Sequence, residues 1–276
     1  MDPDGNSSLP NISSDDLARI RSEQPIVEFK ANKLEKEALK NWDKFYLRNS
    51  TKFFKDRHWT KSELERLLPE VISLENLHIL EAGCGVGNFL FPLLDYFPNI
   101  SQAYACDFSP RAVNYVQDHD SYQSNRIRAF TCDLTEQSSL QAHVPTASVD
   151  LCFMIFVLSA ISPVKMVSAL ENVYRILKPG GCLLIRDYGL YDHAMLRFKP
   201  GHKIEENFYV RQDGTRAYYF SLEKLTEIFR NAGFDLSPGT AGEATENPEY
   251  IFRETVNHKK ELTVPRVYVQ GIFCRK

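Results

Sequence analysis

The chain has 276 residues, of which 43% are hydrophobic, and a formal net charge of -3. This length and hydrophobic content suit one α/β domain with an ample core and an N-terminal extension. No apolar run approaches the ~20 residues that a membrane-spanning helix needs, and the first twenty residues lack the layout of a secretory signal. Because the chain is slightly acidic, a polyanion would have to be bound by a local basic patch or with a helper protein.

Residues 30–47 show the apolar spacing of an amphipathic helix, and this spacing alone suggests that Trp42 and Tyr46 belong to the core. Ser62 can cap a second helix, which Pro69 limits. We therefore expect residues 1–75 to form a helical extension and residues 76–276 to form the main domain.

Strand and helix patterns alternate from residue 76 onward. Strands are predicted at residues 77–82, 103–107, 127–133, 149–158 and 182–187, with helices at 87–96, 109–118, 163–177 and 221–232. Such alternation predicts a parallel sheet with helices on both faces. Residues 250–256 and 266–273 add a terminal hairpin of strands.

The six cysteines form no C-x-x-C pair. Cys106, Cys132, Cys152 and Cys182 fall in predicted strands, where we expect small buried hydrophobic residues. This usage predicts a reducing compartment, so we expect the protein in the cytoplasm, with the nucleus as a second location. No His, Cys and carboxylate cluster has the spacing of metal ligands, so we expect no metal.

The segment I-L-E-A-G-C-G-V-G-N at 79–88 runs from an apolar strand through three glycines into a helix. Glycines let the backbone approach a ligand closely, and a helix N-terminus offers free amides to an anion. A dinucleotide fingerprint would need glycine where Asn88 stands, so an NAD site is disfavoured. The segment predicts a site for another nucleoside cofactor.

Two carboxylates close the next two strands. Asp107 follows Gly83 by 24 residues, a position suited to the hydroxyls of a ribose, and Asp133 ends the third strand. Glycines and two acids at three successive strand ends fit the amino-acid tail, ribose and adenine of S-adenosylmethionine.

With E-A-G-C-G-V-G, Asp107, Cys132-Asp133-Leu134 and L-K-P-G-G at 177–181, the chain resembles class I methyltransferases. The resemblance implies a Rossmann-like fold whose mostly parallel sheet has seven strands with helices on both faces. It also implies that Gly83, Gly85, Asp107, Asp133 and Leu134 bind S-adenosylmethionine.

Three further segments concern the substrate. F-F-K-D-R-H-W at 53–59 interleaves cations with aromatic rings, through Phe54, Lys55, Arg57 and His58. Aromatic faces stack on bases and cations pair with phosphates, which suggests an RNA contact. The alternative is an amphipathic edge whose aromatic rings enter the core while its cations are solvated.

The second segment is R-D-Y-G at 186–189, at the carboxyl end of the fifth strand, where open α/β sheets bind ligands. Asp187 and Tyr188 are candidates to contact a target base, although Asp187 could simply cap the following turn. The third segment is the insert at 197–220, dense in cations and aromatic rings. Arg197, Tyr209, Arg211 and Arg216 are its candidate nucleic-acid contacts.

These motifs together resemble a narrower family, the eukaryotic tRNA methyltransferases that form 3-methylcytidine in the anticodon loop. The shared motifs are W-x-x-F-Y, F-F-K-D-R-H-W, E-A-G-C-G-V-G-N, C-D-F-S, I-F-V-L-S-A, R-D-Y-G and N-F-Y-V-R-x-D-G-T-R. The likeness runs from about residue 33 to residue 273. F-x-E-x-V-N and P-R-V-x-x-Q near the C-terminus resemble the branch that modifies serine tRNAs.

This resemblance implies cytidine 32 of serine tRNAs as the target and seryl-tRNA synthetase as a partner that presents the tRNA. It implies that residues 1–75 form a helical cap that covers the cofactor and contacts the tRNA, and that residues 188–220 form a substrate-binding insert. It also implies that Trp42 and Tyr46 fold over the cofactor, beside Ile155 and the strand-end residues named above.

The chemistry can be weighed against motifs that the chain lacks. Methylation of an exocyclic amine usually calls for an N/D-P-P-Y loop after the fourth strand, where this chain has I-F-V-L-S-A. Attack through a pyrimidine carbon needs an exposed thiolate, whereas Cys152 lies in an apolar strand. The N3 atom of cytosine has an in-plane lone pair and needs no strong base. We expect Asp187 to stabilise the positive charge of the methylated base.

Two other functions remain open from the sequence. The first is a methyltransferase for a small molecule or a protein, because the fold does not fix the acceptor. The second is a non-catalytic scaffold that binds S-adenosylmethionine, although such a protein would be expected to have a damaged cofactor loop.

Overall fold

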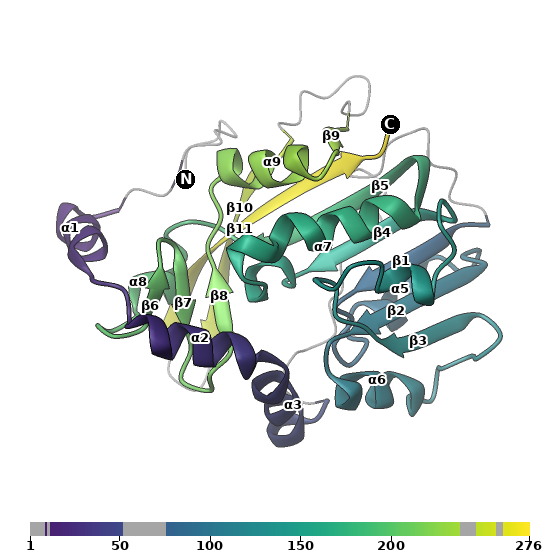
Figure 1. The fold of residues 1–276 in the computed structure, drawn as a ribbon, viewed down its shortest axis with the longest axis horizontal. Coiled ribbons are helices and arrows are strands. Elements are labelled where there is room, and N and C mark those ends of the chain that lie inside the picture. Colours follow the sequence, from purple (N-terminus) through teal and green to yellow (C-terminus); the bar gives the residue numbers. More distant parts are fainter. Residues whose placement is uncertain (1–8, 10–11, 52–75, 238–246, 258–261) are drawn as a thin grey trace.

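The computed structural model describes residue 9 and residues 12–51, 76–237, 247–257 and 262–276. Its centre is one twisted sheet, with strands in the order β10-β11-β5-β4-β1-β2-β3 and a short β9 paired with β11 (Figure 1). The bounds are β1 His78–Ala82, β2 Gln102–Asp107, β3 Ile127–Thr131, β4 Val149–Ile155, β5 Leu177–Tyr188, β9 Asp235–Leu236, β10 Glu249–Asn257 and β11 Leu262–Cys274. Strands β1 to β5 pair in parallel, and β9, β10 and β11 pair antiparallel. The predicted seven strands are confirmed, with β9 as a small addition.

Helices cover both faces of the sheet, as the sequence predicts. Successive residues of a strand point to opposite faces, so Ile79 and Leu80 of β1 enter two different hydrophobic clusters. One cluster includes side chains of α7 (Pro163–Ile176) and α9 (Leu222–Asn231). The other includes those of α5 (Leu90–Tyr96) and α6 (Pro110–Gln117). Burial on both faces explains why the central strands β1 and β4 are mostly apolar.

The N-terminal extension differs from the expected single helix at 30–47. After α1 (Ser14–Ser22), the chain forms α2 (Glu28–Lys36) and α3 (Ala38–Asn49), separated at Glu37, whose φ of -95° and ψ of 9° leave the helical range. The change of direction lets α2 run beside the insert while α3 packs on α6 (Figure 1). The helix expected after Ser62 lies outside the described residues.

The insert forms its own small unit beside the sheet (Figure 1). It contains α8 (His193–Leu196) and a three-stranded antiparallel sheet of β6 (Lys203–Glu205), β7 (Phe208–Val210) and β8 (Arg216–Tyr218). Tyr209 and Tyr219 fill its hydrophobic cluster, which also takes Ile20 from α1. The extension and the insert are therefore packed together, although they lie far apart in the sequence.

Cys182 is buried, as expected, but it is no free thiol, because it forms a disulfide with Cys274 that the expectation of a reducing compartment did not include. The two residues are register partners of the antiparallel pair β5 and β11. That pairing joins residues 92 positions apart, so no local pattern announces it. Cys106, Cys132 and Cys152 are free and buried, as expected. None of the helices in the described ranges is long and apolar enough to cross a membrane.

Candidate active site

The glycine turn after β1 is held against β2 by its own backbone. The amides of Gly83 and Cys84 both donate to the carbonyl of Cys106, at 2.7 and 2.8 Å. Gly83 has a φ of 74°, and a Cβ added there would lie 2.3 Å from the side chain of Val157. Glycine at this position is thus required by the backbone and by the protein's own packing, and the turn keeps its open side toward a cavity.

Asp107, at the end of β2, is fixed by two backbone amides. One carboxylate oxygen accepts from Gly85 at 2.9 Å and the other from Ser109 at 2.8 Å. Burial raises the pKa of Asp107 from 3.8 to about 6, although these amide hydrogen bonds oppose the rise. The carboxylate lines a cavity, and each of its oxygens can accept a second hydrogen bond. It is therefore an ionised acceptor at neutral pH, suited to a pair of hydroxyls.

Asp133 and Leu134 lie on the same cavity beyond the end of β3. One oxygen of Asp133 accepts from both the amide and the hydroxyl of Thr135, each at 2.8 Å. The structure thus brings the two strand-end acids, Gly83 and Leu134 together around one cavity of about 290 Å³. This is the arrangement that the sequence predicts, and the ligand contacts themselves stay a prediction.

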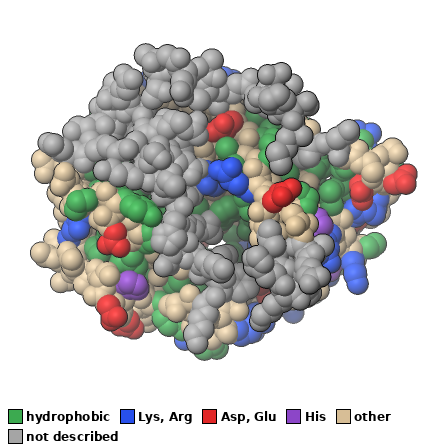
Figure 2. Space-filling model, turned by 180° about the vertical axis from the view of Figure 1, so that it is seen from behind, with side chains coloured by type: hydrophobic (Ala, Val, Ile, Leu, Met, Phe, Trp, Pro, Cys, Tyr) green, Lys and Arg blue, Asp and Glu red, His purple; other side chains and the backbone are tan. Residues whose placement is uncertain are grey.

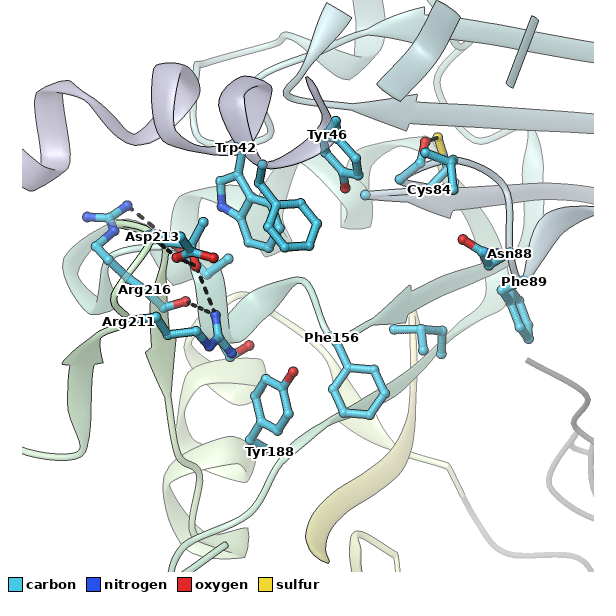
Figure 3. Close-up of a pocket in the computed structure, with 18 of the residues that line it drawn as sticks. Trp42, Tyr46, Cys84, Asn88, Phe89, Phe156, Tyr188, Arg211, Asp213 and Arg216 are labelled. Atoms are coloured by element: carbon cyan, nitrogen blue, oxygen red, sulfur yellow. Dashed lines mark hydrogen bonds between the residues drawn. The ribbon is translucent and has the colours of Figure 1, made fainter. Parts of the chain in front are cut away.

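Helix α3 covers this cavity. Trp42 and Tyr46 point from α3 into the space above the glycine turn (Figure 3). The Tyr46 hydroxyl lies 3.1 Å from the place of a Cβ added at Gly85. Tyr46 also packs in a small cluster with Phe45. Tyr46 is therefore buried, as its spacing suggests, and it lines both cavities. Its contact with a cofactor stays a prediction.

A second cavity of about 330 Å³ adjoins the first. The residues that border both are Trp42, Tyr46, Gly83, Phe156, Ala160 and Arg216. The second cavity also takes Ile155 from the end of β4 and Tyr188 from the end of β5. Seen from behind, the molecule has a hollow with Lys or Arg side chains beside it and hydrophobic side chains within it (Figure 2).

The wall of the second cavity opposite α3 is aromatic and cationic. The rings of Phe156 and Tyr188 lie 4.9 Å apart, and both face the space below Trp42 and Tyr46 (Figure 3). The guanidinium of Arg211 stands 5.4 Å from the centre of the Tyr188 ring. A flat, polar ring fits such a wall, because aromatic faces stack on it and guanidinium groups donate to it.

Asp187 does not lie where the sequence analysis expects it. Its side chain is fully buried and lines neither cavity. Its oxygens accept from the amides of Ser159 and Tyr188, both at 2.9 Å. Burial raises its pKa to about 6, opposed by the hydrogen bonds from Ser159. The carboxylate thus holds two cavity-lining residues in place, and only Tyr188 of the predicted pair faces the cavity.

The predicted substrate contacts of the insert separate into two groups. Arg197 is exposed and Arg211 lines the second cavity. Tyr209 is buried at 1% exposure, stacked on Phe198 with ring centres 4.8 Å apart. Arg216 is buried too, paired with Glu35 of α2.

The expectation that Tyr209 and Arg216 face a nucleic acid from the surface is therefore corrected. All residues of β7 and β8 are buried, so both faces of these strands are covered. Tyr209 lies on the face that joins the cluster with Ile20, and Arg216 lies on the other face, over the Phe208 ring. Arg216 still borders both cavities from within. Phe54, Lys55, Arg57 and His58 lie outside the described residues.

Three cavity residues escaped the sequence analysis. Phe156 has a φ of 60°, which turns its ring into the cavity. Arg266 reaches the cavity from β11, where its Nε lies 2.8 Å from an oxygen of Asp192. Glu35 borders the first cavity from α2. Phe156 and Arg266 belong to the motifs I-F-V-L-S-A and P-R-V-x-x-Q, but the sequence analysis gave neither residue a role, and no motif marks Glu35. Their place at the cavity follows only from the meeting of distant elements.

Comparison with known proteins agrees with this geometry. Residues 80–183 match the model of a methyltransferase domain. Among solved structures, a SAM-dependent methyltransferase from Anabaena variabilis superposes with a TM-score of 0.61, at 13% identity over 92% of this chain and 98% of that one. A putative methyltransferase from Haloferax volcanii, in complex with the activator Trm112, gives 0.57 at 17% identity over 86% of this chain and 96% of that one. These likenesses confirm the class I methyltransferase fold.

Curated relatives are more specific. The chain is 53% identical to human tRNA N(3)-cytidine methyltransferase METTL6, over 96% of this chain and 90% of that protein. It is 40% identical to tRNA N(3)-methylcytidine methyltransferase trm141 of Schizosaccharomyces pombe, over 90% and 96%. It is 38% identical to tRNA N(3)-cytidine methyltransferase METTL2 of Danio rerio, over 90% and 76%. The chain therefore belongs to the family of S-adenosylmethionine-dependent tRNA N(3)-cytidine methyltransferases.

Proposed function

We propose that this protein methylates N3 of cytidine 32 in the anticodon loop of serine tRNAs in the cytoplasm, with seryl-tRNA synthetase presenting the tRNA. The observation that carries the proposal is the pair of adjoining cavities under α3. One has the two strand-end carboxylates, and the other has the rings of Phe156 and Tyr188 with three guanidinium groups. A donor and a flat acceptor can thus meet where the cavities join.

The residues of the first cavity fit the cofactor by their chemistry. Asp107 would accept the ribose hydroxyls, while Asp133 and Leu134 would border the adenine. Gly83 and Gly85, which carry no side chain, would let the amino-acid tail approach the turn closely, and Trp42 and Tyr46 would cover the bound molecule. When bound, S-adenosylmethionine supplies a methyl group on a positively charged sulfur.

The residues of the second cavity would position the base. Phe156 and Tyr188 offer rings on which a cytosine turned out of the loop can stack. Arg211 and Arg266 lie beside Tyr188, with guanidinium carbons 5.4 and 5.8 Å from its ring centre, and can donate to the carbonyl or phosphate oxygens of the nucleotide. The N3 lone pair lies in the base plane, so alignment replaces a strong base. The chain's task is then to hold N3 in line with the methyl group.

The catalytic assignment of Asp187 and Tyr188 remains part of this proposal in a modified form. Tyr188 would contact the base directly. Asp187 would act as a positioning residue, because its oxygens hold the amides of Tyr188 and Ser159. Its negative charge, next to the cavity wall, would also favour the cationic methylated base over the neutral one.

Mass spectrometry of nucleosides tests the proposal. Serine tRNA incubated with the purified protein and S-adenosylmethionine should gain 3-methylcytidine, and a transcript with uridine at position 32 should gain none. Addition of seryl-tRNA synthetase should raise the rate strongly. Equal rates with and without the synthetase would remove the partner from the proposal, and no 3-methylcytidine in either reaction would overturn the function.

A further inference from the structure

The outer surface of α2 and α3 carries a row of cations. Its members are Lys30, Lys33, Lys36, Lys40, Lys44 and Arg48, all exposed. Their spacing of three or four residues places them near one side of each helix, and Lys36 also borders the first cavity. We call this set the α2–α3 basic row. It stands out on a chain whose net charge is -3.

The acids of the same helices do not neutralise the row. Glu35 points inward to Lys165 and Arg216, and Asp43 points inward to Ser109 and Arg111. Glu37 pairs with Lys40 at 3.1 Å, an exposed contact that holds the cation weakly.

The remaining members of the row have no carboxylate partner. Lys33, Lys36, Lys44 and Arg48 form no ion pair within the described part of the chain. Phe29, 81% exposed, adds an aromatic face beside Lys30.

The opposite side of α3 faces the cavities. Each of Trp42 and Tyr46 stands two residues from a cation of the row. At about 100° per residue, this offset places the two rings about 200° around the helix from Lys40, Lys44 and Arg48. One short helix thus carries cations on its solvent side and the cavity cover on its inner side. Anything bound along the basic row would also hold that cover in place.

We propose that the α2–α3 basic row binds the RNA backbone next to the target base and that this contact couples RNA binding to cofactor binding. The inference rests on the proposed tRNA substrate. Exposed cations, four of which form no ion pair within the described residues, with an exposed aromatic ring beside them suit a phosphate chain. By linkage, if RNA holds α3 closed and tightens the cofactor, the cofactor tightens RNA by the same factor.

The test compares two triple variants of equal charge change. One replaces Lys33, Lys44 and Arg48 by Gln, which leaves aside Lys36, a cavity-lining residue. The control replaces Lys224, Arg230 and Lys276 by Gln. Lys224 and Arg230 lie on α9, on the other side of the sheet from α3, and Lys276 ends the chain (Figure 1). Affinity for serine tRNA is measured at several salt concentrations, and affinity for S-adenosylhomocysteine with and without tRNA.

The basic-row variant should bind tRNA about 10- to 100-fold more weakly than wild type at ~0.1 M salt, with a slope of log affinity on log salt that is lower by about 2. Its affinity for S-adenosylhomocysteine without RNA should equal that of wild type. In wild type, tRNA should tighten S-adenosylhomocysteine about fivefold or more, and the variant should lose that gain. The control should behave as wild type.

Three results would overturn the inference. Unchanged tRNA affinity in the basic-row variant would show that the row does not contact RNA. If the variant instead loses affinity for seryl-tRNA synthetase, the row is a protein-docking surface. Unchanged coupling would remove the link to the cofactor. A wild-type protein that binds no tRNA at all would overturn the proposed function as well, which separates the two failures.

Discussion

Asp107 and Asp187 lie at the carboxyl ends of two strands, β2 and β5, and look alike in most local respects. Each carboxylate accepts from two backbone amides at 2.8–2.9 Å. Burial raises the pKa of each to about 6. Yet Asp107 lines the first cavity, whereas Asp187 is fully covered.

The difference comes from the neighbours of each strand end. Beside Asp107 the chain supplies the glycine turn, whose lack of side chains leaves the carboxylate accessible. Beside Asp187 it supplies the short 3-10 turn Leu158–Ala160 and Tyr188 itself. A strand-end carboxylate thus either lines a cavity or braces neighbouring loops from within, according to which loop lies beside it.

The largest expected effect separates the two acids by ligand affinity. Replacement of Asp107 by Ala should weaken S-adenosylhomocysteine binding by about 100-fold or more, because two hydrogen bonds to a charged acceptor are lost. Isothermal titration calorimetry measures this change. Asp187→Asn is the matched control and should change the affinity by less than about threefold. Equal losses in both variants would contradict the contrast drawn here.

A smaller effect concerns stability and the methyl-transfer step. In Asp187→Asn, an amide NH2 replaces one acceptor oxygen, so either Ser159 or Tyr188 loses its partner. We expect a loss of about 1–3 kcal/mol in the free energy of unfolding. Single-turnover methylation at saturating tRNA and cofactor should slow by about 10-fold or more, with little change in cofactor affinity. If Asp187→Asn keeps the wild-type single-turnover rate, Asp187 has no part in the mechanism.

The pH dependence of cofactor binding gives a third, milder contrast. The ionised form of Asp107 accepts hydrogen bonds from hydroxyls, and this form is lost as the pH falls through about 6. Affinity for S-adenosylhomocysteine should therefore fall about tenfold between pH 7 and pH 5. The pH dependence should persist in Asp187→Asn, because the carboxylate that this change removes does not line the cavity. It should vanish in Asp107→Asn. If the affinity of Asp107→Asn for S-adenosylhomocysteine still falls steeply with pH, another titrating group causes the pH dependence.

Much of the cofactor side could be predicted because its signals are local. The turn at Gly83 follows its strand directly, and Asp107 and Asp133 end theirs, so strand order alone brings them to one edge. The alternation of strands and helices likewise fixes the parallel sheet. The break at Glu37, which divides the expected N-terminal helix into two, was not predicted, because no glycine or proline marks it.

The acceptor side could be predicted only in part, because it is assembled from distant pieces. Arg266 comes from the last strand and Phe156 from the end of β4, and neither belongs to a pattern that spacing could reveal. The basic and aromatic content of the insert was recognised, but not which residues turn inward. Tyr209 and Arg216 are buried because their strands pack against the rest of the protein.

The smallest expected effect tests whether any thiol takes part. Cys152 lies in β4, between the strands that carry the two acids, and is fully buried. Burial raises its pKa well above the ordinary value of a thiol, so it holds no thiolate at neutral pH. Cys152→Ala should keep the single-turnover methylation rate within about twofold, at a cost of about 1 kcal/mol in the free energy of unfolding for the small cavity left behind. The rate is measured beside thermal unfolding. A folded Cys152→Ala protein without activity would point to covalent chemistry, because direct attack by a ring nitrogen has no step that requires sulfur from the protein.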